Sequence, residues 1–544
     1  MLIEGCARQA PPPGGPVDVT GPVVTSSYPE PEVSEVPLDI SPWIRFDEWI
    51  LSGSVEGSIF ISPHLESGFA VKTSGKKIKI VFNEELPPDR TIVVTFGSGI
   101  KDSNGNQMSE SFVLAFSTGQ SIDRAGIQGR VKGVIDPASA WIWAYPLVDS
   151  LPPDPSTEKA LFAVQPDLQG FFTLSFLPQG WYRVFGIEET SKDRIWDAQS
   201  ESFAISDRDL YAEEDSFPFT NLMFNRYDNE PPHLRDAVSI HRQGMRFSFS
   251  EPVEISDVEV SIVSYKDRPL PVINEYKDQA DSNAFYITTG MQQTGDIYRI
   301  VLNGLSDENG NIADSISAEV ETSTSVDTVG PSLTWSYPGN GMRDVSLDTP
   351  VKVGFSEAVT LTDLPKAVQI LDSDSIMING SWHYQGASWG TFLPDTLFAE
   401  NSSYQIHVHP DSIRDIFGNR SSDSLAIMNF TTHDTEKFGS ISGNVTGTFE
   451  TPHIVAEGID GVGLYESAVD HDGAFHLTQL IAANYRLWLY EDLDGNHIFT
   501  PGKLDPFTYS EPFQVFDDTV RVRSRWETEA VTLHWHPNRI KMEE

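Results

Sequence analysis

The sequence has a single cysteine, Cys6, among its 544 residues. One thiol cannot form an internal disulfide, so packing and hydrogen bonds must stabilise the fold. The sequence also lacks an uninterrupted apolar run of about 18 residues, the length that a transmembrane helix needs. We therefore predict no transmembrane helix.

Basic residues are scarce relative to acidic ones. The chain has 37 Lys and Arg against 79 Asp and Glu, for a net charge of −42. The Lys and Arg form no long cluster, which disfavours binding to a nucleic-acid phosphate backbone. A strongly solvated surface is the simplest interpretation of the acid excess, and calcium binding or life in high salt are the alternatives.

Long stretches of helical periodicity are hard to find. Short runs rich in Val, Ile, Phe and Thr, separated by turn residues, take their place. The hydrophobic fraction of 39% is enough for packed cores and argues against wholesale disorder. A chain of this length is expected to hold roughly three to five domains, and the pattern predicts an all-β array of small sandwiches.

A short motif, D-x-x-G-N, occurs three times, at residues 102–106, 307–311 and 415–419. An Asp that caps its own turn, followed by a Gly free to adopt positive φ, is typical of a turn between strands. We interpret Asp102, Asp307 and Asp415 as turn caps rather than metal ligands, because each has few acidic neighbours at ligand spacing.

Each copy of this motif belongs to a repeat of about 100 residues with a Pro-marked entry, an F-[DS]-E motif and a Thr-rich end. The F-[DS]-E motifs are Phe46-Asp47-Glu48, Phe249-Ser250-Glu251 and Phe355-Ser356-Glu357. These segments resemble SbsA-type bacterial Ig-like domains. The resemblance implies Ig-like sandwiches at residues 21–120, 229–325 and 326–434.

A second repeat lies between and after these segments. The motif D-x-x-G-x-F-x-L at residues 167–174 returns at 470–477, and Tyr182 returns as Tyr485, so both copies are 303 positions apart. This order of motifs resembles the carboxypeptidase-regulatory-like, or transthyretin-like, β-sandwich. The resemblance implies such domains at 121–228 and 435–544. With short linkers between domains, we expect an elongated string of five Ig-like and transthyretin-like sandwiches.

The N-terminal segment places Cys6 directly before a Pro/Gly-rich tether that ends near residue 20. Ile3-Glu4-Gly5-Cys6 resembles the end of a bacterial lipobox, which implies acylation of Cys6 and attachment to the outer membrane. The alternative is an incidental exposed cysteine in an unstructured end. Asp327-Thr328-Val329 and similar triplets resemble the O-glycosylation sequon of exported Bacteroidota proteins, which fits a lipoprotein of that type.

The best metal candidate is the acidic turn at residues 491–498. Asp492, Asp494 and Asn496 offer oxygen donors at alternate positions, which suits calcium. The turn does not follow the EF-hand pattern, because its Gly comes too early and no Glu closes the loop. The alternative is a β-turn stabilised by Asx hydrogen bonds without an ion.

Other motifs receive structural interpretations. Residues 386–390 match G-x-S-x-G, but they lack the strand-to-helix context of a nucleophile elbow. The pairs His407/His409 and His534/His536 are read as strand histidines. Two tryptophan pairs, Trp141/Trp143 and Trp382/Trp389, are read as core residues, with sugar stacking as the alternative.

These observations predict a non-enzymatic, lipid-anchored cell-envelope protein. It would act as a β-sandwich scaffold, spacer or adhesion module for an unknown envelope protein or glycan, on the cell surface or facing the periplasm. The alternative is a glycan-binding or substrate-capture lipoprotein of an outer-membrane uptake system. Exposed Trp faces at the two pairs would favour that alternative.

Overall fold

The computed structural model describes residues 18–537 except 56, 66, 135–138, 149–151, 192, 199, 215, 227, 229, 257, 279–280, 385 and 460. The predicted lipidation site, Cys6, lies outside this range. The described chain is all-β, as predicted, with a single short α-helix, α1 (Leu364–Ala367), among these residues. None of the described helices has the length and apolarity needed to cross a membrane.

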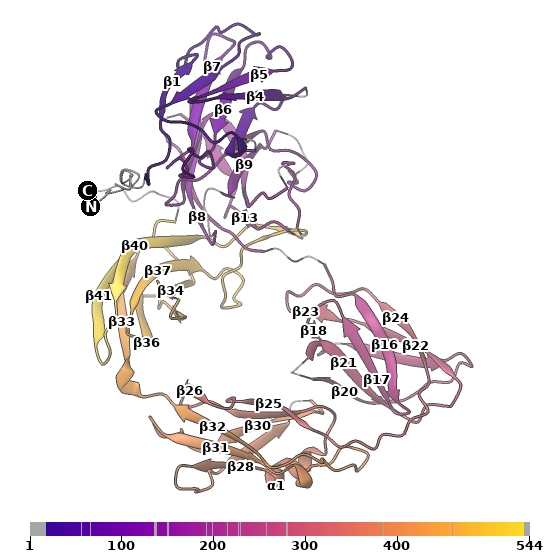
Figure 1. Cartoon of the computed structure of the whole chain (residues 1–544). Coiled ribbons are helices and arrows are strands. Elements are labelled where there is room, and N and C mark those ends of the chain that lie inside the picture. The colour runs from indigo at the N-terminus through magenta and orange to yellow at the C-terminus, as the bar shows by residue number, and fades with distance from the viewer. Residues whose placement is uncertain are drawn as a thin grey trace, which may run out of the picture.

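The larger sheets form five packed pairs, which we call sandwiches 1 to 5 in chain order, and two two-stranded sheets are added to sandwiches 3 and 5 (Figure 1). Sandwich 1 contains strands β1 (Val24–Tyr28), β2 (Trp43–Phe46), β3 (Ile59–Ser62), β4 (Phe69–Ser74), β5 (Lys77–Phe82), β6 (Thr91–Phe96) and β7 (Phe112–Ser117). Its sheets have the orders β1-β2-β5-β4 and β3-β6-β7.

Sandwich 2 has the sheets β10-β9-β12-β13 and β11-β8-β15, with β14 added on β12. Its strands are β8 (Ala125–Lys132), β9 (Trp141–Pro146), β10 (Phe162–Val164), β11 (Phe171–Leu177), β12 (Gly180–Ile187), β13 (Phe203–Ile205), β14 (Leu210–Ala212) and β15 (Phe219–Met223).

Sandwiches 3 and 4 share with sandwich 1 a four-stranded sheet of similar order, β16-β17-β21-β20 and β25-β27-β30-β29. Sandwich 3 contains β16 (Leu234–His241), β17 (Gly244–Phe249), β18 (Val253–Glu254), β19 (Glu259–Ser264), β20 (Val272–Asp278), β21 (Asp281–Thr289), β22 (Ile297–Asn303), β23 (Ser306–Asp307) and β24 (Ile316–Glu321). Sandwich 4 contains β25 (Leu333–Tyr337), β26 (Met342–Val345), β27 (Val351–Phe355), β28 (Val368–Asp372), β29 (Gly380–Tyr384), β30 (Trp389–Pro394), β31 (Ser403–Val408) and β32 (Ala426–Thr432).

Sandwich 5 repeats the topology of sandwich 2. Its strands are β33 (Phe438–Thr446), β34 (Pro452–Gly458), β35 (Leu464–Ala468), β36 (Ala474–Ile481), β37 (Asn484–Glu491), β38 (Lys503–Leu504), β39 (Phe507–Thr508), β40 (Phe513–Arg521) and β41 (Glu527–His534). The order β36-β33-β41 matches β11-β8-β15, and the last strand of each sheet pairs in parallel with the first strand of its sandwich. The 303-residue repeat therefore reflects two copies of one fold.

Five clusters of buried apolar residues lie one in each of the predicted ranges, and each is built mainly of Val, Ile, Leu and Phe. Alternating burial along the strands produces these cores. In β36, for example, Phe475, Leu477 and Leu480 point inward while the residues between them face solvent. The precise domain boundaries remain a prediction.

The D-x-x-G-N turns form as the sequence predicts. In the first copy, Asp102 Oδ1 accepts hydrogen bonds from the backbone N–H groups of Asn104 and Asn106, at 2.8 and 2.7 Å. Gly105 adopts φ +96°, a conformation that a side chain would strain. Asp307 and Asp415 accept the same pair of backbone hydrogen bonds in their own turns.

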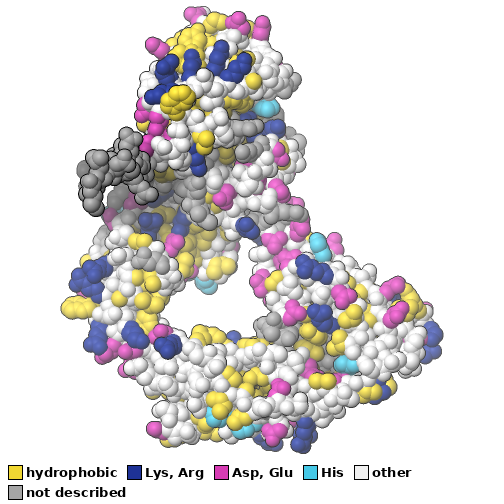
Figure 2. Space-filling view, in the orientation of Figure 1, with side chains coloured by type: hydrophobic (Ala, Val, Ile, Leu, Met, Phe, Trp, Pro, Cys, Tyr) yellow, Lys and Arg dark blue, Asp and Glu magenta, His cyan; other side chains and the backbone are white. Residues whose placement is uncertain are grey.

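The five sandwiches do not form the elongated string that we expected from the short linkers. The chain turns back on itself, so that sandwich 5 lies against sandwich 2, and Figures 1 and 2 show an open space enclosed by sandwiches 2 to 5. Leu504 and Phe507 of sandwich 5 pack against a buried cluster of sandwich 2 that includes Trp141 and Phe185. The linkers set how far each joint can bend, whereas these apolar contacts select one closed arrangement.

Candidate metal centre

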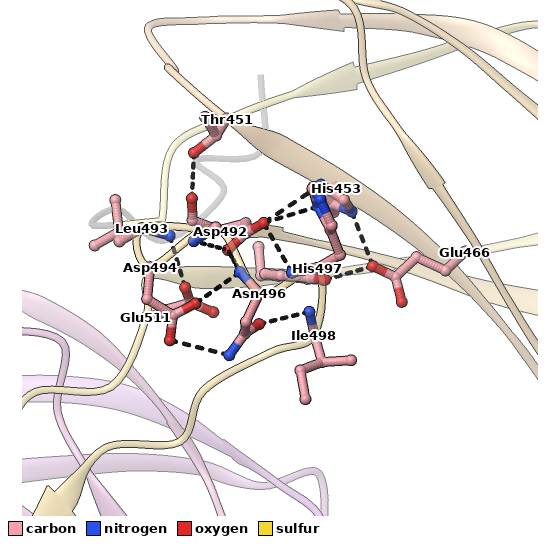
Figure 3. A network of polar contacts seen from close by, with 12 residues as sticks. Thr451, His453, Glu466, Asp492, Leu493, Asp494, Asn496, His497, Ile498 and Glu511 are labelled. Carbon is pink, nitrogen blue, oxygen red and sulfur yellow. Dashed lines mark hydrogen bonds and ion pairs between the residues drawn. The ribbon is translucent and has the colours of Figure 1, made fainter. Parts of the chain in front are cut away.

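The acidic turn predicted to bind calcium follows β37 and lies within a compact polar network (Figure 3). Strand β37 is buried along most of its length, and this places Asp492, directly after it, at the edge of the core. The Asp492 side chain is only 2% exposed. After the turn, the chain runs through β38 and β39 before it re-enters the sheet at β40.

Three carboxylates meet at this turn. Asp492, Asp494 and Glu511 each bring one oxygen within 4.8 Å of the others. Glu511 lies just before β40 and was missed by the sequence interpretation, because it is distant from the turn along the chain. The β38–β39 hairpin separates Glu511 from the turn, and no motif near Glu511 indicates that it lies close to Asp492.

The predicted ligands Asp492 and Asn496 already take part in hydrogen bonds within the turn. Asp492 Oδ1 accepts from the backbone N–H groups of Gly495 and Asn496, at 2.7 and 3.1 Å. The Asn496 side-chain oxygen accepts from the backbone N–H of Ile498 at 2.8 Å. These bonds form the Asx-type turn that is the alternative to a calcium site.

Glu511 ties the two ends of the loop together. Its Oε1 accepts from the backbone N–H of Leu493 at 2.6 Å, and its Oε2 accepts from that of Thr500 at 2.9 Å. Burial raises the pKa of Glu511, and the nearby negative charges of Asp494 and Asp492 add to the effect. A cation beside these oxygens would relieve that repulsion.

Two imidazoles face Asp492 from the side opposite Asp494 (Figure 3). Asp492 Oδ2 lies 3.2 Å from His497 Nδ1 and 3.8 Å from His453 Nε2. Burial opposes the charged form of Asp492, but the backbone N–H groups of His497 and Gly495 and the two imidazoles outweigh it and lower the pKa of Asp492. The turn therefore holds an ionised carboxylate beside two nitrogen donors.

The equivalent turn in sandwich 2 has a different side chain at the position of His497. Arg194 stands 303 positions before His497, and both residues adopt positive φ, 65° and 62°. Glu201 Oε1 accepts from the backbone N–H groups of Thr190 and Ser191, as Glu511 does in its own loop. In both sandwiches, hydrogen bonds from backbone N–H groups to a glutamate hold the loop in shape. The two loops differ in the side chains that could bind a metal ion.

A trio of acidic residues recurs in sandwiches 1, 3 and 4. Each trio brings together an Asp at the sandwich entry, the Glu of F-[DS]-E and the capping Asp of D-x-x-G-N. The trios are Asp18/Glu48/Asp102, Asp228/Glu251/Asp307 and Asp327/Glu357/Asp415. The sequence motifs identified two members of each trio but not their contact with the entry residue.

In the trio of sandwich 4, the pKa of the glutamate is strongly raised. Burial raises the pKa of Glu357 to about 8, and the negative charges of Asp327 and Asp415 contribute to the shift. One oxygen of Asp327, Oδ2, is buried without a hydrogen-bond partner, and the imidazole nitrogen His241 Nε2 lies 3.7 Å from it. Glu357 is thus a neutral, protonated carboxyl group at moderately acidic pH.

The other motifs occupy structural positions. Ser388 of G-x-S-x-G is buried, donates to the Lys277 carbonyl oxygen at 3.0 Å and is followed by strand β30 rather than a helix. His407 contacts the Gln405 side chain, and His534 contacts Thr446. Among the described residues, neither histidine belongs to a group of three close metal-ligating side chains.

The tryptophan pairs differ in exposure. Trp141 and Trp143 are buried in the cluster that contacts sandwich 5, so their faces are not free to stack on a sugar. Trp382 and Trp389 are half-buried, and Trp382 packs on the core of sandwich 4. The sugar-stacking alternative thereby loses one of its two supports. The sequence interpretation did not single out Trp181, which is exposed and packs edge-to-face on Tyr211.

Comparisons with known proteins identify part of the chain. No curated protein matches it. The N-terminal part of the bacterial S-layer protein SbsC is 15% identical, covering 37% of this chain and 44% of that chain, with a TM-score of 0.16. L,D-transpeptidase 3 from Mycobacterium tuberculosis is 15% identical, covering 26% of this chain and 45% of that chain, with a TM-score of 0.14.

Domains 1–6 of the surface layer protein SbsC are 10% identical, covering 92% of this chain and 67% of that chain, with a TM-score of 0.16. This chain spans less than half the length of the first two solved chains, and none of these scores supports an inference about function. The family model described as "Bacterial Ig-like domain" matches residues 18–118 and 327–432. Residues 18–118 and 327–432 are therefore bacterial Ig-like domains.

Proposed function

We propose that this protein is a non-enzymatic, lipid-anchored scaffold of the bacterial cell envelope. Its five sandwiches would close into a rigid frame that holds binding surfaces at fixed positions outside the cytoplasm. The observation that carries the proposal is the docking of sandwich 5 on sandwich 2, which turns a chain of separate domains into one closed body. Rigid frames of this kind present loops and strand edges in a defined geometry.

The docking surface includes a partly buried polar group. Arg183 of β12 is 8% exposed and forms two hydrogen bonds with Asp209, at 2.9 and 3.0 Å. Its guanidinium also donates to the Tyr509 hydroxyl at 3.1 Å and lies 4.0 Å from the centre of the Phe507 ring. The Tyr509 hydroxyl in turn donates to Asp209 Oδ2 at 2.7 Å. A bidentate arginine–carboxylate pair that also bonds the neighbouring sandwich favours one docking geometry.

A second set of contacts lies on the other sheet of sandwich 2. Asn221 of β15 donates through Nδ2 to the carbonyl oxygens of Phe513 and Pro537, at 2.7 and 3.1 Å. Arg130 forms an ion pair with Asp517 at 2.6 Å. Met223 packs against the buried cluster of sandwich 5 that contains Trp488. The two sandwiches therefore meet along both sheets.

A basic face on sandwich 1 supports a location beside a membrane. Lys72 pairs across the strands with Lys79, and Arg45 pairs with Lys77, so like charges lie directly opposite one another. Such pairs are destabilising unless a negatively charged partner neutralises them. Figure 2 shows Lys and Arg gathered on this sandwich, in a chain whose net charge is −42. An anionic membrane surface next to the predicted anchor would supply that partner.

The anchor is tested at Cys6. Expressed in a bacterial host behind a lipoprotein signal peptide, the chain should fractionate with outer membranes, and Cys6→Ser should release it into the soluble fraction, because a diacylated cysteine provides two-chain anchoring. Mass spectrometry of the N-terminal peptide should show the acyl groups. Protease shaving of intact cells then distinguishes the cell surface from the periplasmic side. Membrane association that survives Cys6→Ser, with no acylated peptide, would overturn the anchor.

The basic face is tested with vesicles and the unacylated Cys6→Ser chain. We expect Lys72→Glu with Lys79→Glu to weaken binding to phosphatidylglycerol vesicles by at least about tenfold at low salt, because each lysine near an anionic surface contributes about 1 kcal/mol. The matched control is Lys366→Glu with Lys437→Glu, which reverses two exposed charges around sandwich 4. Equal losses in both variants would show a non-specific effect of net charge.

A further inference from the structure

We propose that His453, Asp492 and His497 form a binding site for a divalent transition-metal ion of the zinc class. One ligand atom from each of the three residues lies within 4.8 Å of the other two. Two imidazole nitrogens and one carboxylate oxygen form a donor set that zinc prefers and that calcium, which binds oxygen, does not. This site differs from the predicted calcium site in its ligands and in the side of Asp492 that it uses.

His453 is oriented by a carboxylate behind it. The ring nitrogen Nδ1 lies 2.9 Å from Glu466 Oε1, which also accepts a hydrogen bond from the Tyr490 hydroxyl. An ionised carboxylate only accepts hydrogen bonds, so Nδ1 carries the proton and Nε2 faces Asp492. A metal-binding histidine is typically held in this way, with its second nitrogen donating to a carboxylate. A solvent-facing strand histidine would not need such a partner.

Asp492 and His497 complete the group from one turn. The Asp492 carboxylate is held by the backbone N–H groups of Gly495 and His497, the latter donating to Oδ2 at 3.1 Å. The His497 side chain is 78% exposed, whereas that of His453 is 12% exposed. His453 and Asp492 are therefore buried ligands, and His497 is a ligand exposed to solvent.

The three ligand atoms would need to move only slightly to bind an ion. A tetrahedral ion with bonds of about 2.0–2.1 Å holds its ligand atoms about 3.3 Å apart. The Asp492 oxygen lies 3.2 Å from His497 Nδ1 and 3.8 Å from His453 Nε2, so only small shifts are needed along these two edges. The exposed His497 ring can make the remaining adjustment toward His453, and solvent would supply the fourth ligand.

The test measures Zn²⁺ binding by calorimetry and Co²⁺ binding by visible absorption, on the full chain purified without a histidine tag. We expect one ion per chain, with a tetrahedral Co²⁺ spectrum. His497→Ala should abolish both signals; the side chain is exposed, and circular dichroism checks that the turn tolerates alanine at its positive φ. Glu466→Gln should weaken binding about 10–100-fold through the orientation of His453. Excess Ca²⁺ should not displace the ion.

The matched control is His471→Ala. His471 lies 3.7 Å from Asp472 on the same sandwich, and both side chains are exposed, at 91% and 82%. This substitution should leave the binding unchanged. An equal loss in His471→Ala and His497→Ala, an octahedral Co²⁺ spectrum, or displacement by Ca²⁺ would overturn the site. None of these outcomes bears on the docking of sandwiches 2 and 5, which is tested separately.

Discussion

Asn221→Asp combined with Phe507→Ala should open the chain between sandwiches 2 and 5 and increase its radius of gyration. In the closed chain, the Asn221 amide donates to two carbonyl oxygens and is 7% exposed. An aspartate of the same shape would place a buried negative charge against both carbonyls, at a cost of about 3–5 kcal/mol. In the open chain this carboxylate would face water, so the cost falls on closure.

The second substitution acts at the other side of the docking surface. Phe507→Ala removes the ring that packs on the buried cluster of sandwich 2 and lies beneath the Arg183 guanidinium. Together the two changes should lower the equilibrium constant for closure of the chain by at least about 100-fold, since each 1.4 kcal/mol is about a factor of ten. Small-angle X-ray scattering measures the expansion, and circular dichroism checks that the sandwiches stay folded.

A matched pair of substitutions away from the docking surface provides the control. Asn429→Asp makes the same amide-to-acid change, and Trp181→Ala also replaces an aromatic ring with alanine, at exposed positions on sandwiches 4 and 2. Their scattering should match that of the unchanged chain. If the docking variant scatters like the control while its sandwiches remain folded, the contacts between sandwiches 2 and 5 do not hold the frame closed. The scaffold proposal would then lose its main support.

Glu357→Gln should remove most of the pH dependence of stability in sandwich 4. The pKa of Glu357 is raised to about 8 in the folded chain, against about 4.3 in an unfolded one. Between these values the folded state binds more protons than the unfolded state, so the free energy of unfolding falls as pH rises. The stabilisation is full below about pH 4.3 and is lost as pH passes through about 8.

The full shift would correspond to about 5 kcal/mol, which we reduce to about 1–3 kcal/mol because Glu357 is half-buried and solvent screens its charge. Glutamine is neutral at every pH, so the variant should be more stable than the unchanged chain at pH 8 and similar to it at pH 5. Since a chain of several domains does not unfold in one step, hydrogen exchange of amides in β27 and β30 is the suitable measurement.

Asp374→Asn provides the control for charge, because it removes one exposed carboxylate from the same sandwich. It should leave the pH dependence intact. A loss of stability in Glu357→Gln at all pH values, with the slope preserved, would show that Glu357 works in its ionised form. If added Ca²⁺ then stabilised the unchanged chain but not the variant, Glu357, Asp327 and Asp415 would be identified as a cation site.

The sequence by itself determined the repeated elements of this protein. Alternating apolar residues predict the strands, and the D-x-x-G-N motif predicts the turns, because both depend on residues within a few positions of each other. Asp415 therefore caps its own turn in the structure as predicted. The repeat at an offset of 303 residues likewise predicts two related sandwiches, and their strand orders agree.

The tertiary structure alone decided which distant residues meet. Glu511 and His453 join Asp492, and Arg45 stands opposite Lys77, through contacts between segments that no local pattern reveals. The closed frame is also absent from the sequence pattern, because docking depends on the shape and charge of whole surfaces. Arg183 and Tyr509 lie far apart in the chain, and only the folded sandwiches bring the guanidinium and the hydroxyl within 3.1 Å. Local sequence specifies each sandwich, whereas contacts between finished sandwiches specify the frame.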